Sequence, residues 1–286
     1  MIHRLAMLFA AASMLCGNAA AAFDTVHFAS LDEQHTVLDA YLFRPDSGGP
    51  RPAVVFLHGC GGVIMQNGNL NSREVDWAER LNAAGYVALV VNSLTPRHFG
   101  ETCSVQGARP ELARDRPKDA YAALVWLQAQ DLVRGDRIGA MGWSQGGGTI
   151  LYAIGNNSTS RPAGLPRQRD FHAAVVFYPG SCSEKNLSAS WTTTVPTLVL
   201  IGAEDVWIQN AACQAFLAAA AARGASVQLQ VYPGAYHDFD WPGLLVQRRP
   251  EYTTATGVVP ITGMDPAARD DALQRVPGFF AQHLGP

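Results

Sequence analysis

The chain has 286 residues, of which 48% are hydrophobic, with 21 basic and 24 acidic side chains and a formal net charge of −3. This length suits one large α/β domain. The basic residues form no cluster, so the sequence gives no reason to expect nucleic acid as a partner.

The first 22 residues have the pattern of a secretory signal peptide. A basic residue, Arg4, precedes an apolar run over residues 5–15, and three alanines at 20–22 match the small-residue cleavage pattern. We therefore expect an exported protein, periplasmic or secreted, whose single domain covers residues 23–286.

No stable membrane anchor is expected. The signal segment is too short to span a bilayer securely, and no later apolar run is long enough to do so. Lipid attachment at Cys16 would need a small residue before it, and that position holds Leu15.

The rest of the chain alternates between apolar strand patterns and helical patterns. An antiparallel hairpin at 26–28 and 37–43 comes first. Nearly continuous apolar runs, typical of parallel strands covered on both faces, follow at 53–57, 86–91, 138–143, 173–178, 197–201 and 227–232. Helical patterns lie at 73–84, 117–130, 147–154, 210–223 and 267–283.

This alternation predicts an α/β fold with a doubly wound, mostly parallel sheet and helices on both faces. The segment 242–260 lacks clear periodicity, and we expect it to form either a flap or a wrap near the C-terminus.

Gly142-Trp143-Ser144-Gln145-Gly146 joins a predicted strand to a predicted helix. In such a G-x-S-x-G turn the serine has a strained backbone conformation, and glycines two residues away on each side avoid a clash. The turn lifts the hydroxyl clear of the sheet and points the N-terminal end of the helix at it. Ser144 is therefore the candidate nucleophile.

A serine hydroxyl needs a base to take its proton and an acid to orient that base. In this type of fold the order along the chain is serine, acid, histidine. Asp205 follows the strand at 197–201 and is the candidate acid, with the adjacent Glu204 as an alternative. His237 follows the strand at 227–232 and is the candidate base.

The turn at 56–62, Phe-Leu-His-Gly-Cys-Gly-Gly, ends another strand. Its glycines allow backbone N–H groups to face one point. We expect an oxyanion hole formed by the N–H groups of Cys60 and Gln145.

Four cysteines remain after signal removal, and an even number in an exported protein favours disulfides. Three pairings are possible. The predicted topology puts Cys60 and Cys103 on neighbouring loops and leaves Cys182 with Cys213, while four unpaired thiols are the alternative. No metal site or cofactor is predicted, because no C-x-x-C or H-x-x-x-H spacing occurs.

With these residues in place, the chain resembles the dienelactone hydrolase family of α/β-hydrolases over nearly all of its mature length. The matching segments are FLHGCGG at 56–62, GWSQGG at 142–147, FYPG at 177–180, GAEDVW at 202–207 and YHDF at 236–239. The resemblance implies the α/β-hydrolase fold, with Ser144, Asp205 and His237 as nucleophile, acid and base.

The chain departs from the family in two respects. Dienelactone hydrolases use a cysteine nucleophile where this chain has Ser144, and they carry a glutamate in the oxyanion-loop strand. The chain is more similar to an exported branch with serine. We therefore expect a small-molecule carboxylic ester or lactone as substrate rather than dienelactone itself.

The resemblance also places Arg97 near where family members hold a substrate carboxylate, although a solvated arginine or a pair with Glu101 would explain it equally well. Trp143, Tyr178 and Trp207 border the predicted site. They are candidates for the walls of an acyl or aromatic pocket, and core packing is the alternative.

The predicted activity is ester or lactone hydrolysis through an acyl-enzyme. An acyltransferase or a peptidase on the same scaffold is the first alternative, since a triad sets neither the leaving group nor the acceptor. A non-catalytic periplasmic binding protein is the second. The sequence predicts no oligomeric state.

Overall fold

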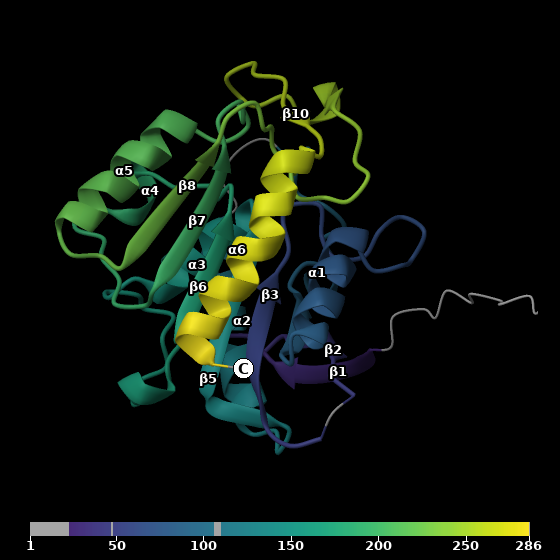
Figure 1. Ribbon diagram of the computed structural model, residues 1–286, viewed down its shortest axis with the longest axis vertical. Coiled ribbons are helices and arrows are strands. Elements are labelled where there is room, and N and C mark those ends of the chain that lie inside the picture. The colour runs from purple at the N-terminus through teal and green to yellow at the C-terminus, as the bar shows by residue number, and fades with distance from the viewer. Residues whose placement is uncertain (1–22, 47, 106–109, 286) are drawn as a thin grey trace, which may run out of the picture.

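An eight-stranded sheet in the order β1-β2-β4-β3-β5-β6-β7-β8 forms the centre of the structure, a computed structural model that describes residues 23–46, 48–105 and 110–285 (Figure 1). The predicted signal peptide lies outside the described residues. The strands are β1 (Asp24–Ala29), β2 (Val37–Phe43), β3 (Arg51–Leu57), β4 (Val87–Asn92), β5 (Val133–Trp143), β6 (Ala173–Phe177), β7 (Thr197–Gly202) and β8 (Val227–Tyr232).

The sheet is mostly parallel, as predicted. β2 runs antiparallel to both β1 and β4, and the neighbouring strands from β4 to β8 run parallel to one another. Strands β4, β6 and β7 are buried along their whole length, which explains their continuous apolar sequence. The N-terminal hairpin predicted at 26–28 and 37–43 is present as β1 and β2, which lie at one edge of the sheet.

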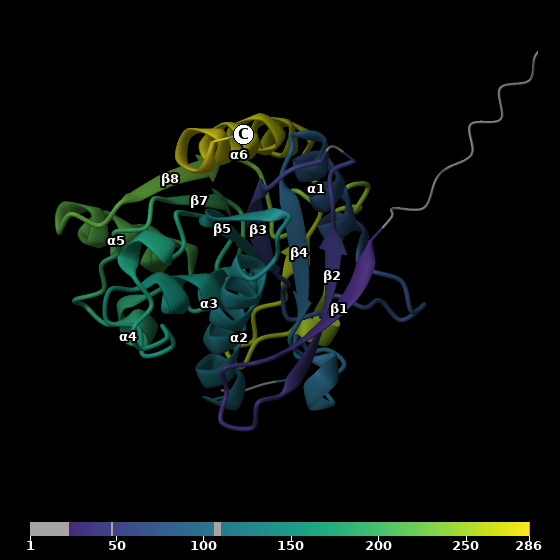
Figure 2. The same cartoon turned by 90° about the horizontal axis from the view of Figure 1, so that it is seen from below.

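Helices cover both faces of this sheet (Figure 2). On one face α1 (Ser72–Ala83) and α6 (Pro266–Leu284) bury Trp77 and Phe280 in a core with the sheet. The other face carries α2 (Pro110–Gln128), α3 (Gln145–Ile154) and α5 (Asn210–Ala222), whose apolar side chains form a second core. A short helix, α4 (Glu184–Leu187), follows β6.

Helix α2 differs most from its prediction. It begins at Pro110, whereas the sequence pattern put its start at Pro117, a residue type that is common in the first turn of a helix. Pro117 lies inside the helix, where it cannot donate a backbone hydrogen bond. Leu112 and Arg116, in the turns that precede Pro117, are both buried.

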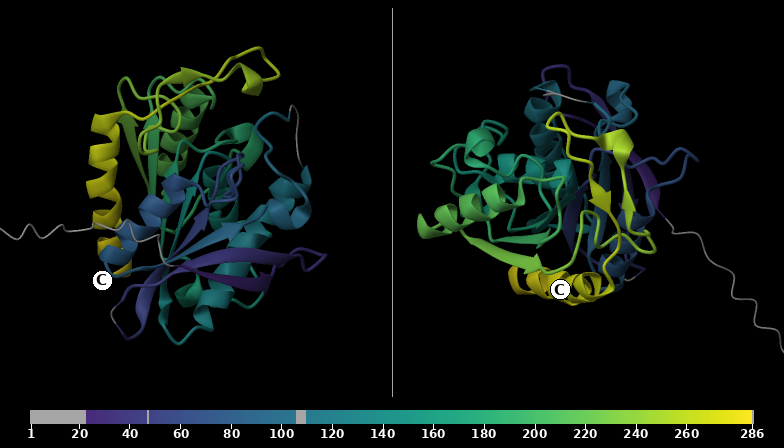
Figure 3. Two further views of the ribbon diagram at one scale, coloured as in Figure 1. Left: turned by 90° about the vertical axis from the view of Figure 1, so that its right-hand side faces the viewer. Right: turned by 90° about the horizontal axis from the view of Figure 1, so that it is seen from above.

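The segment 242–260 wraps over the carboxyl end of the sheet (Figure 3). Its strand β9 (Gln247–Arg248) pairs with β10 (Ile261–Thr262), and a short 3-10 helix, η3 (Pro250–Tyr252), lies between them. Thr262 also forms a parallel bridge with His237. This segment is therefore anchored beside the predicted base.

Among the residues that the structure describes, no helix combines the length and the apolar character that a bilayer crossing requires.

Candidate active site

Ser144 lies in the turn between β5 and α3 with φ 50° and ψ −115°. This is a strained conformation for a residue with a side chain. A Cβ at Gly146 would lie 2.0 Å from the carbonyl oxygen of Leu57, and one at Gly142 would lie 2.8 Å from the backbone of Gly146. Both flanking positions therefore need glycine, for the steric reason that the sequence suggested.

Asp205 and His237 meet as an acid–base pair. Nδ1 of His237 is 2.6 Å from Oδ2 of Asp205, and both side chains are buried. The other carboxylate oxygen of Asp205 accepts hydrogen bonds from the N–H groups of Trp207, at 2.9 Å, and Ile208, at 3.3 Å. These contacts fix the carboxylate, whereas the alternative acid, Glu204, is exposed to solvent.

The surroundings of His237 suit a base. Burial by itself would lower its pKa, but the charge and hydrogen bond of Asp205 outweigh burial and leave the pKa above its ordinary value. A neutral imidazole that donates from Nδ1 to Asp205 keeps Nε2 free of a proton. The rings of Tyr178 and Trp207 hold the imidazole in place, with centroids 4.4 and 4.9 Å from it.

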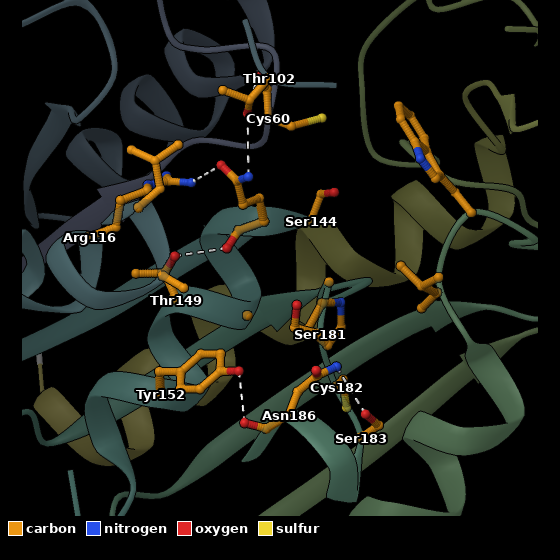
Figure 4. Close-up of a pocket in the computed structure, with 18 of the residues that line it drawn as sticks. Cys60, Thr102, Arg116, Ser144, Thr149, Tyr152, Ser181, Cys182, Ser183 and Asn186 are labelled. Atoms are coloured by element: carbon orange, nitrogen blue, oxygen red, sulfur yellow. Dashed lines mark hydrogen bonds between the residues drawn. The ribbon is translucent and has the colours of Figure 1, made fainter. Parts of the chain in front are cut away.

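A pocket of about 590 Å³ opens beside Ser144 (Figure 4). Cys60 and Thr102 lie on one side of the serine, and Ser181 and Cys182 lie on the other. Trp207 also lines the pocket. Polar side chains form a large part of its wall.

Ser144 and the Asp205–His237 pair lie at the same edge of the sheet. Trp207 touches the imidazole and lines the pocket that contains Ser144. Gly59 lies between Ser144 and Arg73, the arginine whose charge acts on His237. A Cβ placed on Gly59 would be 3.6 Å from Cβ of Ser144 and 3.9 Å from Nη2 of Arg73. Within the described part of the chain, however, no hydrogen bond joins the Ser144 hydroxyl to the imidazole.

The two expected oxyanion donors line the pocket with Ser144. Gln145 is the first residue of α3, so its N–H has no acceptor within the helix. The turn that carries Cys60 is ordered by His58, whose Nδ1 lies 2.6 Å from the carbonyl oxygen of Gly59 and whose Nε2 accepts from the N–H of Ser93 at 3.2 Å. Burial, together with the charge of Arg116, holds the pKa of His58 well below its usual range, so this imidazole stays neutral.

Both expected disulfides are present, Cys60–Cys103 and Cys182–Cys213. All four cysteines line the pocket, so each disulfide forms part of its wall. The Cys60 loop is held further by the N–H of Thr102, which donates to the carbonyl oxygen of Cys60 at 2.8 Å.

Of the three aromatic residues proposed as pocket walls, only Trp207 lines the pocket. Trp143 and Tyr178 are fully buried. The indole Nε1 of Trp143 and the hydroxyl of Tyr178 donate to the buried carboxylate of Asp240, at 2.8 and 2.5 Å. For Trp143 and Tyr178 the core-packing alternative is therefore correct, because their polar atoms bind Asp240 rather than face the pocket.

The proposed substrate contact of Arg97 is also wrong. Its guanidinium binds the carboxylate of Asp119 through two nitrogens, each at 2.8 Å, and that of Asp32 at 2.7 Å. Arg97 does not line the pocket, and its partners are these two aspartates rather than Glu101. Both terminal nitrogens of the guanidinium bind these two buried carboxylates, so they are not free to hold a substrate carboxylate.

Sequence reasoning missed two buried arginines near the site. Arg73 on α1 donates to Asp238 at 2.8 Å, to Glu74 at 3.0 Å and to the Tyr178 hydroxyl at 3.1 Å. Arg116 on α2 lines the pocket. A single arginine in a helical pattern gives no local sign of its role. The one sequence signal near Arg116 is the FLHG segment, because that segment contains His58, which Arg116 contacts.

No group of three or more histidine, cysteine or acidic side chains suited to a metal ion occurs in the described ranges 23–46, 48–105 and 110–285.

The chain is similar to known proteins in both sequence and fold. The model of the dienelactone hydrolase family matches residues 38–284. A probable 2-oxo-3-(5-oxofuran-2-ylidene)propanoate lactonase from Bradyrhizobium sp. is 28% identical over 204 residues, which cover 70% of this chain and 78% of that protein.

Two solved structures have a similar fold. A dienelactone hydrolase-like promiscuous phosphotriesterase from metagenomic libraries superposes with a TM-score of 0.65 at 21% identity, covering 92% of this chain and 100% of the other. Thermogutta terrifontis esterase 2, phosphorylated by paraoxon, superposes with a TM-score of 0.64 at 18% identity, covering 92% and 96%.

Proposed function

This chain belongs to the dienelactone hydrolase family and is a hydrolase of the ester or lactone type, and we propose that it works through a Ser144–His237–Asp205 triad and an acyl-enzyme. The observation that carries the proposal is the buried Asp205–His237 pair at the sheet edge where Ser144 lies in a strained turn beside a pocket.

In the proposed reaction, Oγ of Ser144 attacks the carbonyl carbon of the substrate while Nε2 of His237 takes the hydroxyl proton. The carbonyl oxygen becomes an oxyanion, which the N–H groups of Cys60 and Gln145 bind. When the intermediate collapses, the bond to the leaving oxygen breaks, and His237 returns the proton to that oxygen.

Water then repeats the sequence on the acyl-enzyme. The oxygen of a water molecule attacks the acyl carbon while His237 accepts a proton from that water. The bond between Ser144 and the acyl group then breaks, and His237 returns the proton to Oγ. Throughout, Asp205 holds the imidazole orientation and stabilises its protonated form.

Carboxylic esters or lactones of small molecules are the proposed substrates. The serine suits general ester hydrolysis, because it needs no thiolate. The similarity to a probable lactonase supports the inclusion of lactones.

The test is hydrolysis of a short p-nitrophenyl ester by the wild type and by Ser144→Ala. By analogy with serine proteases, loss of the nucleophile should reduce turnover by about 10⁶. Turnover that survives in Ser144→Ala at more than a hundredth of the wild-type rate would refute the assignment.

Acyl transfer remains the main alternative outcome, since the triad does not choose between water and an alcohol as acceptor. Product analysis in the presence of competing alcohols separates transfer from hydrolysis, and a panel of esters and short peptides separates an esterase from a peptidase.

Export to the periplasm or the medium is proposed as well. Two disulfides are consistent with an oxidising compartment, and the pattern of residues 1–22 supports a cleaved signal. The N-terminal sequence of the protein purified from its native host tests this, and a start at Phe23 is the expected result.

A further inference from the structure

We propose that Arg116 is a positioning residue for the oxyanion hole: it joins the two segments that carry the oxyanion donors and places a positive charge beside them. This inference rests on the proposed function and assigns a role to a residue that the triad does not include.

Arg116 contacts both segments directly. One terminal nitrogen, Nη1, donates to Oε1 of Gln145 at 2.6 Å. The other, Nη2, donates to the carbonyl oxygen of His58 at 2.6 Å. His58 is two residues before Cys60, so a single planar group connects the Cys60 turn to the residue that follows the nucleophile.

A second connection closes the network on the far side of Gln145. Its amide Nε2 donates to Oγ1 of Thr102 at 3.3 Å, and the N–H of Thr102 donates to the carbonyl oxygen of Cys60 at 2.8 Å. The Cys60–Cys103 disulfide ties the same loop covalently. The Gln145 side chain therefore lies between Arg116 and Thr102, and both partners contact the Cys60 loop.

Among the described residues, no carboxylate contacts the guanidinium of Arg116 directly. Its hydrogen bonds go to a backbone carbonyl and an amide oxygen, both neutral, and its Nε has no hydrogen-bond partner among the described residues. The acid whose charge acts on it, Asp119, is itself bound by Arg97 through two nitrogens.

Arg116 is only 1% exposed, so water screens its charge weakly. Burial lowers the pKa of Arg116 to about 10, which still leaves the guanidinium protonated at neutral pH. A buried positive charge beside the oxyanion donors stabilises negative charge when it develops on the substrate oxygen, and does much less for the neutral ester.

Loss of Arg116 should therefore affect the chemical step more than substrate binding. We expect Arg116→Met to lower kcat by about 10² to 10³, the range found when one oxyanion donor is lost, and to change KM by less than about threefold. Arg116→Lys keeps the charge but cannot reach both oxygens with a planar fork, so an intermediate loss of about tenfold is expected.

The experiment measures kcat and KM for a p-nitrophenyl ester. Active sites are counted by stoichiometric labelling with a fluorophosphonate, so that misfolded protein is not included in the enzyme concentration. Arg114→Ala is the matched control, since Arg114 lies on the same helix, is half exposed and pairs with Asp115. It should behave as the wild type.

Rescue separates a positioning role from a merely structural one. Guanidinium ion at tens of millimolar should raise the kcat of Arg116→Ala several-fold, while sodium at the same ionic strength should not. If the Met and Ala variants do not fold, Arg116→Lys alone decides the question.

Wild-type kcat in Arg116→Met or in Arg116→Lys would overturn the proposal. A large rise in KM with kcat unchanged would also overturn it, because Arg116 would then bind substrate rather than position the oxyanion donors. Ser144→Ala distinguishes the two failures: if that variant is inactive while Arg116→Met is fully active, only the role of Arg116 is wrong.

Discussion

Two buried arginines, Arg73 and Arg116, lie near the site, and they have opposite electrostatic surroundings. Arg73, whose charge acts on His237, is 3% exposed in its side chain and contacts the carboxylates of Glu74 and Asp238. Arg116, behind the oxyanion donors, is 1% exposed and donates to neutral oxygens.

The pKa values reflect this difference. Burial lowers the pKa of both groups, but around Arg73 the neighbouring charges, with Glu74 the strongest, raise it well above the ordinary value. For Arg116 burial dominates and the pKa falls to about 10. We infer that Arg73 holds the structure together, whereas Arg116 leaves its charge available to the reaction.

On the histidine side of the site, the largest expected effect comes from replacing Asp205. Asp205→Asn should lower kcat by about 10⁴, because the amide no longer favours the productive tautomer of His237. A ratio of rates below about tenfold would show that Asp205 does not orient the base.

The same variant carries a pH signature. His237 must be neutral to act as a base, and its pKa is raised by Asp205, so wild-type kcat/KM should fall as pH drops through a value above 6.5. Without the carboxylate the pKa falls, and this acid limb should move to lower pH. A limb that stays in place in Asp205→Asn would contradict the pairing.

Stability measurements test the difference between Arg73 and Arg116 most directly. Arg73→Met leaves buried carboxylates without their counter-charge and should lower the free energy of unfolding by about 3–5 kcal/mol. Arg116→Met leaves two neutral acceptors unpaired, for about 1–3 kcal/mol. Urea unfolding at pH 7 gives both values, and equal losses would remove the distinction.

The disulfides sharpen the comparison further. They join residues 43 and 31 positions apart, so replacing either pair by alanine should reduce stability by about 2–4 kcal/mol. Only loss of the Cys60–Cys103 pair should also lower kcat per active site, because that disulfide holds an oxyanion donor. The Cys182–Cys213 variant is the control, and an equal fall in its kcat would argue against this difference.

The smallest effect is expected at Trp207, which packs on His237 and stacks on Tyr252 at 5.3 Å. Trp207→Ala should lower kcat/KM by about tenfold or less, since an aromatic contact contributes about 0.5–1.5 kcal/mol. A change above a hundredfold would mean that Trp207 contributes more than packing to the reaction.

Most of the fold was predictable because its signals are local. Continuous apolar runs gave the parallel strands, and the order of serine, acid and histidine along the chain gave a pair, Asp205 and His237, that the structure joins. The two glycines around Ser144 were predictable because a steric rule ties them to the turn. Helix α2 was misplaced because Pro117 has the same appearance at a helix start and inside a helix held by packing.

The supporting side chains could not be predicted, because their roles depend on partners far away in the sequence. Arg73 and Asp238 are 165 residues apart, and Arg116 and His58 are 58 apart. The assignment of Arg97 failed for the same reason, since nothing nearby in the sequence shows that Asp32 and Asp119 bind it. The burial of Trp143 could have been predicted. It is the last residue of a buried strand, in which side chains alternate between two faces that are both covered.

Reaction with a fluorophosphonate, followed by peptide mass spectrometry, tests the central claim most directly. A serine made nucleophilic by His237 should form a stoichiometric covalent adduct at Ser144, and Ser144→Ala should take up none. Absence of labelling in a folded wild-type protein, or an adduct at another residue, would contradict the account.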